Sequence, residues 1–199
     1  KVLADKYRYF QNEIKKKKII KSMEVDRVVY VTNDNIQKTP EGEVLDFLKL
    51  NKCTFDGVIK PKKLKLNINK WIYNELIETK ILTENFIKNY RFDEAAKTIY
   101  KFVWNTYCDW YLELSKTILL SKNNSDIKEI KTTSGQVFKE ILILLHPFIP
   151  FITEELWLRN KLKTKNTKYL MYSNWISLKK LKTDKSIQSV NEIIELISS

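Results

Sequence analysis

Few side chains of this 199-residue chain have the types and spacing that catalysis or metal binding requires. Cys53, Cys108 and the single histidine, His146, do not form the closely spaced cluster of a zinc site. His146 precedes Pro147 within an apolar run, so we expect it to pack or to cap a helix rather than to act as a catalytic base. The three glycines are isolated, and no phosphate-binding glycine loop is predicted.

Two pairs of adjacent carboxylates, Asp93-Glu94 and Glu154-Glu155, are the remaining candidates for acid–base chemistry. Each pair begins a predicted helix, where negative charge is favourable near the positive end of the helix dipole. We therefore expect them to stabilise helix starts. No catalytic residue, metal site or cofactor site is predicted within residues 1–199.

The charge distribution favours a polyanionic partner. The net charge is +12. Residues 1–65 carry 16 Lys or Arg against nine Asp or Glu, and residues 159–185 carry nine against one. Basic flanks of this kind suit RNA, because each neutralised phosphate releases counterions. A lysine-rich surface that merely solvates the chain is an equal alternative. Only four of the 36 cations are Arg, so we expect contacts to the backbone more than to bases.

The sequence contains no apolar run of about 18 residues, and its N-terminus lacks the apolar segment of a secretory signal. Two distant cysteines require no disulfide. We expect a cytoplasmic protein with no membrane partner.

Apolar spacing predicts a mainly α protein, an antiparallel helical bundle over residues 64–199 with a small mixed, basic appendage over residues 1–63. No Gly or Pro interrupts Lys62–Ser134, which favours long helices. The first predicted helix spans residues 67–89, and the second runs from an N-cap at Asp93 to residue 120. The apolar face of the second helix is expected to comprise Ala96, Ile99, Tyr100, Val103, Tyr107, Trp110, Tyr111, Leu114 and Ile118.

Further predicted elements follow in order along the chain. They are a loop over residues 121–133, a helix over 134–146, a helix opened by Pro150 over 151–162, a basic loop over 161–168, an extended segment over 169–175 and a last helix from 184. In the appendage, we expect a basic helix over residues 1–20, a strand over Val25–Asn33 and a turn at Pro40–Gly42.

Three segments, in order, resemble valyl-tRNA synthetases. They are LKLNINKWI (Leu64–Ile72), the stretch Arg91–Lys116 with its core FVWNTYCDWYLEL, and LLHPFIPFITEELW (Leu144–Trp157). The second segment favours valine, and the third is shared with the leucine and isoleucine relatives. The resemblance covers about residues 50–199, and the last helix resembles the start of the family's C-terminal extension.

This resemblance implies the anticodon-binding domain of a class I aminoacyl-tRNA synthetase, which activates valine with ATP and Mg²⁺ and esterifies it to its tRNA. The implied partners are valine-specific tRNA and the catalytic domain of the same polypeptide. That catalytic domain is not within these residues, since its signature needs two histidines and a glycine together. The segment Glu43–Cys53 lacks the Asn and Arg-Phe elements usual before the bundle, and residues 1–46 do not match.

Candidate RNA contacts lie on polar surfaces. Arg91, between the first two helices, is the best single candidate for a phosphate or base contact. Lys97, Lys101 and Asn105 recur every four residues as a polar stripe, which is equally explained by solvation. Nonspecific attraction is expected from Lys161, Lys163, Lys165 and Lys168. Trp104, Trp110 and Tyr111 are predicted to pack in the core rather than to stack on bases.

Two alternatives remain open at this point. In the first, the domain has a purely structural role and docks a catalytic domain. In the second, it is a free-standing paralogue with a different partner.

Overall fold

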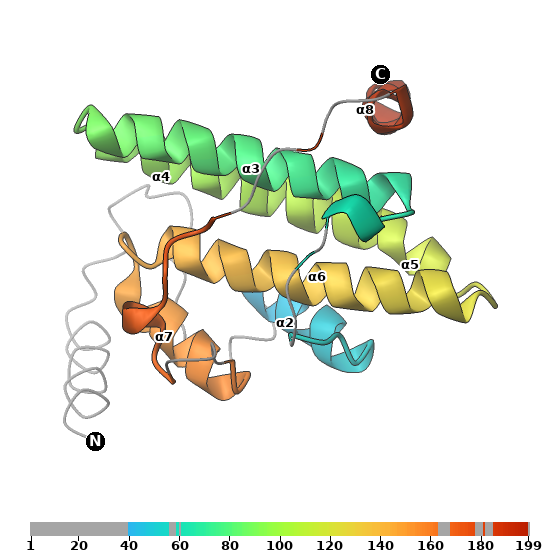
Figure 1. The fold of residues 1–199 in the computed structure, drawn as a ribbon, viewed down its shortest axis with the longest axis horizontal. Coiled ribbons are helices and arrows are strands. Elements are labelled where there is room, and N and C mark those ends of the chain that lie inside the picture. The colour runs from blue at the N-terminus through green and yellow to red at the C-terminus, as the bar shows by residue number, and fades with distance from the viewer. Residues whose placement is uncertain are drawn as a thin grey trace, which may run out of the picture. The chain divides into compact units, whose positions relative to one another are not determined.

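The computed structural model describes residues 40–55, 59, 61–162, 168–177, 181 and 185–198. The chain divides into two units, Lys1–Thr32 and Asn33–Ser199, and every described residue belongs to the second. All regular elements among the described residues are helices, which confirms the mainly α prediction (Figure 1). The helix predicted over residues 1–20 and the strand predicted over Val25–Asn33 lie outside the described residues.

Three long helical segments pack side by side. They are α3 (Asn67–Lys88), the continuous segment α4 (Phe92–Lys101), η4 (Phe102–Leu112) and α5 (Glu113–Leu119), and α6 (Asn124–Leu145). Short connections at residues 89–91 and 120–123 make neighbouring segments antiparallel (Figure 1). The predicted bundle and the bounds predicted for its first helix are thus confirmed.

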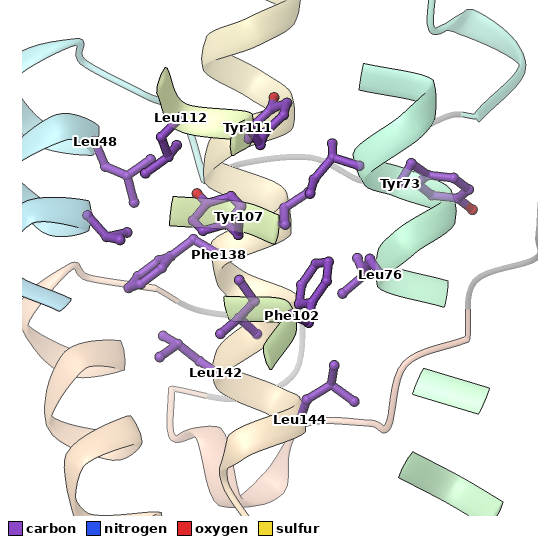
Figure 2. Packing of buried hydrophobic residues seen from close by; sticks show 14 of the residues in the cluster. Leu48, Tyr73, Leu76, Phe102, Tyr107, Tyr111, Leu112, Phe138, Leu142 and Leu144 are labelled. Carbon is purple, nitrogen blue, oxygen red and sulfur yellow. The ribbon is translucent and has the colours of Figure 1, made fainter. Parts of the chain in front are cut away.

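The aromatic segment η4 is a π-helix of 11 residues. Its backbone hydrogen bonds join residues five apart, so each turn takes up more residues than an α-turn does. Phe102, Tyr107 and Leu112, which follow one another at this wider spacing, are buried, as is Tyr111. Figure 2 shows Tyr107 beside Phe138 within the hydrophobic cluster.

The apolar face predicted for this segment from α-helical spacing is therefore wrong in part. Val103 and Trp110 are only half-buried, and Tyr100 is exposed, whereas Phe102 and Leu112, which were not predicted, are buried. The wider turn rotates the side chains after Lys101, among them Val103 and Trp110, away from the positions that a regular α-helix would give them. Tyr100 precedes this turn, in α4, where Ala95 and Ile99 are the buried residues.

The loop predicted over residues 121–133 is also wrong, because α6 already begins at Asn124. Asn123 caps this helix, and its Oδ1 accepts hydrogen bonds from the backbone N–H groups of Ser125 at 3.0 Å and Asp126 at 3.4 Å. Ile130 and Thr133 are buried, which anchors the polar first turns to the core. The connection to α5 is correspondingly short.

Gly135 of α6 lies where another part of the chain crosses the helix. The backbone N–H of Thr54 donates to Lys131 O at 3.3 Å, and Nε2 of Gln136 donates to Phe55 O at 2.6 Å. A Cβ atom at position 135 would lie 2.3 Å from Thr54 O. Glycine is required here because the two backbones approach so closely.

The helix α2 (Pro40–Leu50) replaces the turn predicted at Pro40–Gly42. Proline suits the first helical position, since its missing N–H would have no acceptor within the helix. Val44 and Leu48 are buried in the same hydrophobic cluster as residues of α3 and α6. The domain boundary between residues 63 and 64 stays a prediction.

After α6, the chain turns at Pro147 into α7 (Pro150–Arg159), which Pro150 opens as predicted. A short 3₁₀ turn, η5 (Leu170–Tyr172), lies in the segment that was expected to be extended. Glu154 of α7 accepts hydrogen bonds from the backbone N–H groups of Leu170 at 3.0 Å and Met171 at 3.2 Å. The pair Glu154-Glu155 therefore does not stabilise a helix start as predicted, because α7 begins at Pro150 and has no acidic residue in its first turn; Glu154 fixes the returning chain instead. Asp93 and Glu94 do lie in the first turn of α4, as predicted.

The C-terminal segment runs back along α3 and ends in α8 (Lys185–Ser198). Nε1 of Trp175 donates to Glu84 at 2.7 Å, and the backbone N–H of Leu181 donates to Asn74 at 3.0 Å. Near the start of α3, Nε1 of Trp71 donates to Oδ1 of Asn191 in α8 at 2.7 Å. We call the described residues 175–177, 181 and 185–191 the strap, because Trp175, Leu181 and Asn191 are fastened to residues near both ends of α3.

None of the described helices combines the length and the apolar character that a membrane span requires. A further short helix, η3 (Pro61–Lys63), precedes α3.

Candidate nucleic-acid interface

The turn between α3 and α4 is a Schellman motif, a compact way to end a helix. The backbone N–H of Arg91 donates to Phe86 O at 2.9 Å, and that of Tyr90 donates to Ile87 O at 3.0 Å. Such a motif requires a left-handed residue just past the helix end, and Tyr90 occupies that position with φ 58°. Glycine usually stands there, because a side chain costs about 1–2 kcal/mol in this conformation.

Tyr90 is an exposed aromatic residue at this turn that sequence analysis did not select. It follows directly on the first predicted helix, residues 67–89; α3 ends at Lys88, and Tyr90 is 83% exposed. Its ring meets that of Phe92, 52% exposed, edge to face, with centroids 6.4 Å apart and planes at 77°. No glycine marks the end of the helix at this point, so the sequence did not single Tyr90 out.

Arg91 lies between these two rings in sequence and is the N-cap residue of α4, so the N-cap predicted at Asp93 is wrong. Its side chain is 59% exposed, as a ligand contact requires. The guanidinium carbon lies 5.1 Å above the ring of Phe86, and Nη2 lies 3.6 Å from Glu94. These two interactions hold the guanidinium in place and partly neutralise it.

Lys97 and Lys101 lie one turn apart on α4, and both are exposed. Lys97 Nζ lies 3.7 Å from Asp93 and 4.0 Å from Glu94. Asn105 is exposed as well, but it lies in η4, where the α-helical spacing that related it to Lys101 no longer applies. The two lysines therefore share one face of α4, whereas Asn105 is rotated around the helix axis relative to them.

A second group of predicted cations follows α7. Lys161 is exposed and ends the helix with φ 53°, in a Schellman motif like that at Tyr90. Lys168 is exposed, with Nζ 5.7 Å from the centre of the Tyr169 ring. Lys163 and Lys165 lie outside the described residues.

Tyr107 and Tyr111 serve the interior and not the surface. The hydroxyl of Tyr111 donates to Oδ1 of Asn69 at 2.8 Å, and that of Tyr107 donates to Ser134 O at 2.9 Å. Burial raises the pKa of both phenols, which keeps them neutral donors. Of the three aromatic residues considered for base stacking, Tyr111 is therefore confirmed as core, and Trp104 stacks on Tyr100 with centroids 6.0 Å apart.

His146 is a packing and capping residue, as expected. It is the C-cap of α6, and its Nδ1 lies 2.8 Å from Oγ1 of Thr153 in α7. Burial raises the pKa of the Cys53 thiol to about 11, which makes this group unreactive at neutral pH. Neither residue has the surroundings of a catalytic base or nucleophile.

One small apolar pocket opens between α2, η4, α6 and α7, with a volume of about 40 Å³. Its lining contains no charged side chain, and ligand sites are usually several hundred Å³. The lining residues are Val44, Val103, Trp104, Tyr107, Cys108, Phe138, Ile141, Leu142, Leu145 and Leu156. The exposed cations and aromatic rings are therefore a better candidate for a binding surface than this pocket is.

Comparison with known proteins found a matching family model and a series of similar proteins. A family model described as the anticodon-binding domain of tRNA ligase matches residues 69–199. Valine–tRNA ligase of Pelagibacter ubique is 53% identical over 153 residues, and that of Bartonella henselae is 37% identical over 154; each match covers 77% of this chain and 17% of the relative. Valine–tRNA ligase of Rhizobium meliloti is 36% identical over 153 residues, with 76% and 16% covered.

These matches confirm the resemblance drawn from the three sequence segments. The chain spans about one sixth of the length of these relatives, 17% of the first two.

Proposed function

Since this chain belongs to the family of anticodon-binding domains of tRNA ligases, we propose that its helical bundle binds tRNA for a ligase that charges tRNA with valine. The match over residues 69–199 is the observation that carries this proposal. Valine specificity is inferred from the relatives, all of which bear the name valine–tRNA ligase among those compared above.

The exposed cations support tRNA binding. Lys97 and Lys101 project from one face of α4, and Lys161 and Lys168 lie beyond α7, each with an exposed side chain. Lysine acts on phosphate as a point charge, so these residues suit attraction to the RNA backbone. We assign the same part to Lys163 and Lys165, an RNA contact beside the two lysines of α4 to Asn105, and a directed phosphate or base contact to Arg91.

The remainder of the reaction belongs to other parts of such a ligase. We propose that a catalytic domain of the same polypeptide binds ATP and Mg²⁺ and that the bundle docks against it. No residue of the present chain is assigned to that chemistry. The cytoplasm, where tRNA charging supports translation, is the proposed compartment.

Measuring affinity for tRNA across a range of salt concentrations tests the proposal. The slope of log affinity against log salt is negative, and the double variant Lys97→Gln, Lys101→Gln should make it shallower by about 1.4–1.8 if both lysines contact phosphates. A matched control is Lys116→Gln, Lys122→Gln, which removes two exposed charges near the other end of the same helical segment. The control should leave the slope within one unit of the wild type.

Absence of tRNA binding by the wild-type chain at low salt would contradict the proposal. A purely structural domain predicts something else, namely that charging by the parent ligase is lost only when the bundle unfolds. Arg91→Glu and Tyr111→Ala separate the two, since Arg91 is exposed and Tyr111 is buried. Tyr111→Ala should unfold the bundle, whereas Arg91→Glu should leave it folded and weaken tRNA binding.

A further inference from the structure

We infer that Tyr90 and Phe92 form a stacking site for one unpaired nucleobase of the bound tRNA. The inference rests on the proposed function and deepens it, because it assigns base contact to two aromatic rings that sequence analysis did not select. We call these two rings, at the turn between α3 and α4, the aromatic turn. Three features of this turn carry the argument.

The first feature is a strained backbone without a packing reason. Tyr90 holds a left-handed conformation, φ 58°, at a position where glycine fits without strain. Its side chain is 83% exposed, so little of the ring is buried to offset that strain. Strained residues with exposed side chains are typical of binding sites, where the ring serves a ligand rather than the fold.

The second feature is the arrangement of the two rings. The edge-to-face contact between Tyr90 and Phe92, at 6.4 Å, holds the rings in a fixed relative orientation. Because so much of Tyr90 is exposed, a face of its ring is open to solvent. A nucleobase that is not paired in a helix stacks on such a ring, and proteins that bind single-stranded RNA use this contact repeatedly.

The third feature is the balance of charge around the rings. Glu94 lies 3.6 Å from Arg91 and 4.0 Å from Lys97, and Asp93 lies 3.7 Å from Lys97. Each of the two cations beside the aromatic turn thus lies near a carboxylate that screens part of its charge. The rings themselves are uncharged and suit the face of a base, while Lys97 and Lys101 along α4 remain for the RNA backbone.

The occupant is a base in a single-stranded loop, since paired bases stack on one another and leave no face for a side chain. The net charge of +12 brings the chain to RNA, and the aromatic turn then holds one base. An anticodon loop supplies bases of this kind. If the rings instead contacted a protein partner, removing them would not change the affinity for RNA. The experiment below therefore separates a nucleobase from a protein partner.

Binding of a synthetic tRNA anticodon stem-loop, with fluorescent 2-aminopurine at each loop position in turn, tests the inference. With the full chain, one position should be quenched by stacking. Tyr90→Gly should abolish that quenching and weaken binding about five- to 150-fold. The slope of log affinity against log salt should not change, because no phosphate contact is lost. Phe92→Ala should weaken binding in the same manner.

Tyr90→Gly cannot act by unfolding the turn, since glycine suits φ 58° better than tyrosine does. Its melting temperature should equal or exceed that of the wild type. The matched control is Leu120→Ala, which removes an 87% exposed apolar side chain at the far end of the segment Phe92–Leu119, about 40 Å away. This control should bind the stem-loop as the wild type does.

Two results would overturn the inference. If Tyr90→Gly binds as tightly as the wild type, the rings hold no base, although the proposed tRNA binding stands. If its affinity falls together with the salt slope, the turn acts through Arg91 and phosphate rather than by stacking. If the wild-type chain binds no RNA at low salt, the proposed function itself fails.

Discussion

The side-chain carboxylate of Glu129 accepts a hydrogen bond of 2.9 Å from Nδ2 of Asn69, 60 residues earlier in the chain. The same oxygen accepts the backbone N–H of Leu66 at 3.0 Å. Leu66 is the N-cap residue of α3 and has no capping side chain of its own. Since Asn69 also accepts the hydroxyl of Tyr111, a residue of α6 caps α3 and aligns it with η4.

Glu129→Ala should lower the free energy of unfolding by about 2–4 kcal/mol. The substitution leaves the buried amide of Asn69 and the N–H of Leu66 without their acceptor. Urea denaturation followed by circular dichroism measures the change. Glu113→Ala is the control, since Glu113 pairs with Lys116 on an exposed surface and should contribute about 0.5 kcal/mol or less. Equal unfolding midpoints for the two variants would show that Glu129 caps nothing of consequence.

Gly135→Ala should destabilise the protein, although alanine is the better helix former by about 1 kcal/mol. The new Cβ would lie 2.3 Å from Thr54 O, and a backbone atom cannot move aside as a side chain end can. We expect a loss of about 1–3 kcal/mol from the displaced crossing. Lys128→Ala, at an exposed position of the same helix, should change the melting temperature little. A stabilised Gly135→Ala variant would contradict the close approach of the two backbones.

Lys161→Gly should stabilise the end of α7 by about 1 kcal/mol, since φ 53° suits glycine better than lysine. The same variant loses one of the cations proposed for tRNA, so stability should rise while tRNA affinity falls. Thermal unfolding and tRNA titration measure the two quantities separately. Lys161→Ala keeps the unfavourable conformation, and it should lose tRNA affinity without the gain in stability.

Glu140 should make the protein more stable in mild acid than at neutral pH. Burial raises the pKa of its carboxyl from 4.5 to about 7. The folded state therefore binds a proton more tightly than the unfolded state does, so the stabilisation is complete below about pH 4.5 and is lost as the pH rises through about 7. Between pH 5 and pH 8, the free energy of unfolding should fall by about 2–3 kcal/mol on account of this group.

Glu140→Gln removes the titrating carboxyl and should flatten this part of the pH profile while raising stability at pH 8. Glu113→Gln, at an exposed position, should leave the profile unchanged. Urea midpoints measured from pH 5 to pH 8 compare the three proteins. A wild-type midpoint that does not vary with pH would rule out a buried, protonated Glu140.

Elements with strong local signals were predictable from the sequence. The helix Asn67–Lys88 follows from the regular spacing of large apolar residues such as Trp71 and Leu76, and Pro150 marks the start of α7. The first turns of α6 were missed because their composition is polar, and their burial depends on a few residues such as Ile130 that contact the rest of the bundle. Tertiary packing decides such a segment, and local propensity does not.

The interface was predictable only in its charges. Exposed lysines such as Lys97 follow from composition and spacing. The position of Asn105 could not be predicted in this way, because an aromatic-rich sequence does not by itself indicate a π-helix. The π-helix changes which side chains share a face. Tyr90 was missed for a related reason: its place depends on where α3 ends, and helix ends are set by a hydrogen-bond pattern that no glycine marks here.

The strap has a consequence for how the chain is made. Trp71 and its partner Asn191 are 120 residues apart, and a ribosome adds about 5–20 residues per second. The surface of α3 that α8 covers therefore stays exposed for roughly 6–24 seconds during synthesis, until α8 has been added to the chain. Apolar side chains alone would accept the late segment in several alignments. The indole N–H of Trp71 and the side-chain oxygen of Asn74 each bond to one particular group of the strap, so a misplaced segment would leave these polar groups unpaired and be disfavoured.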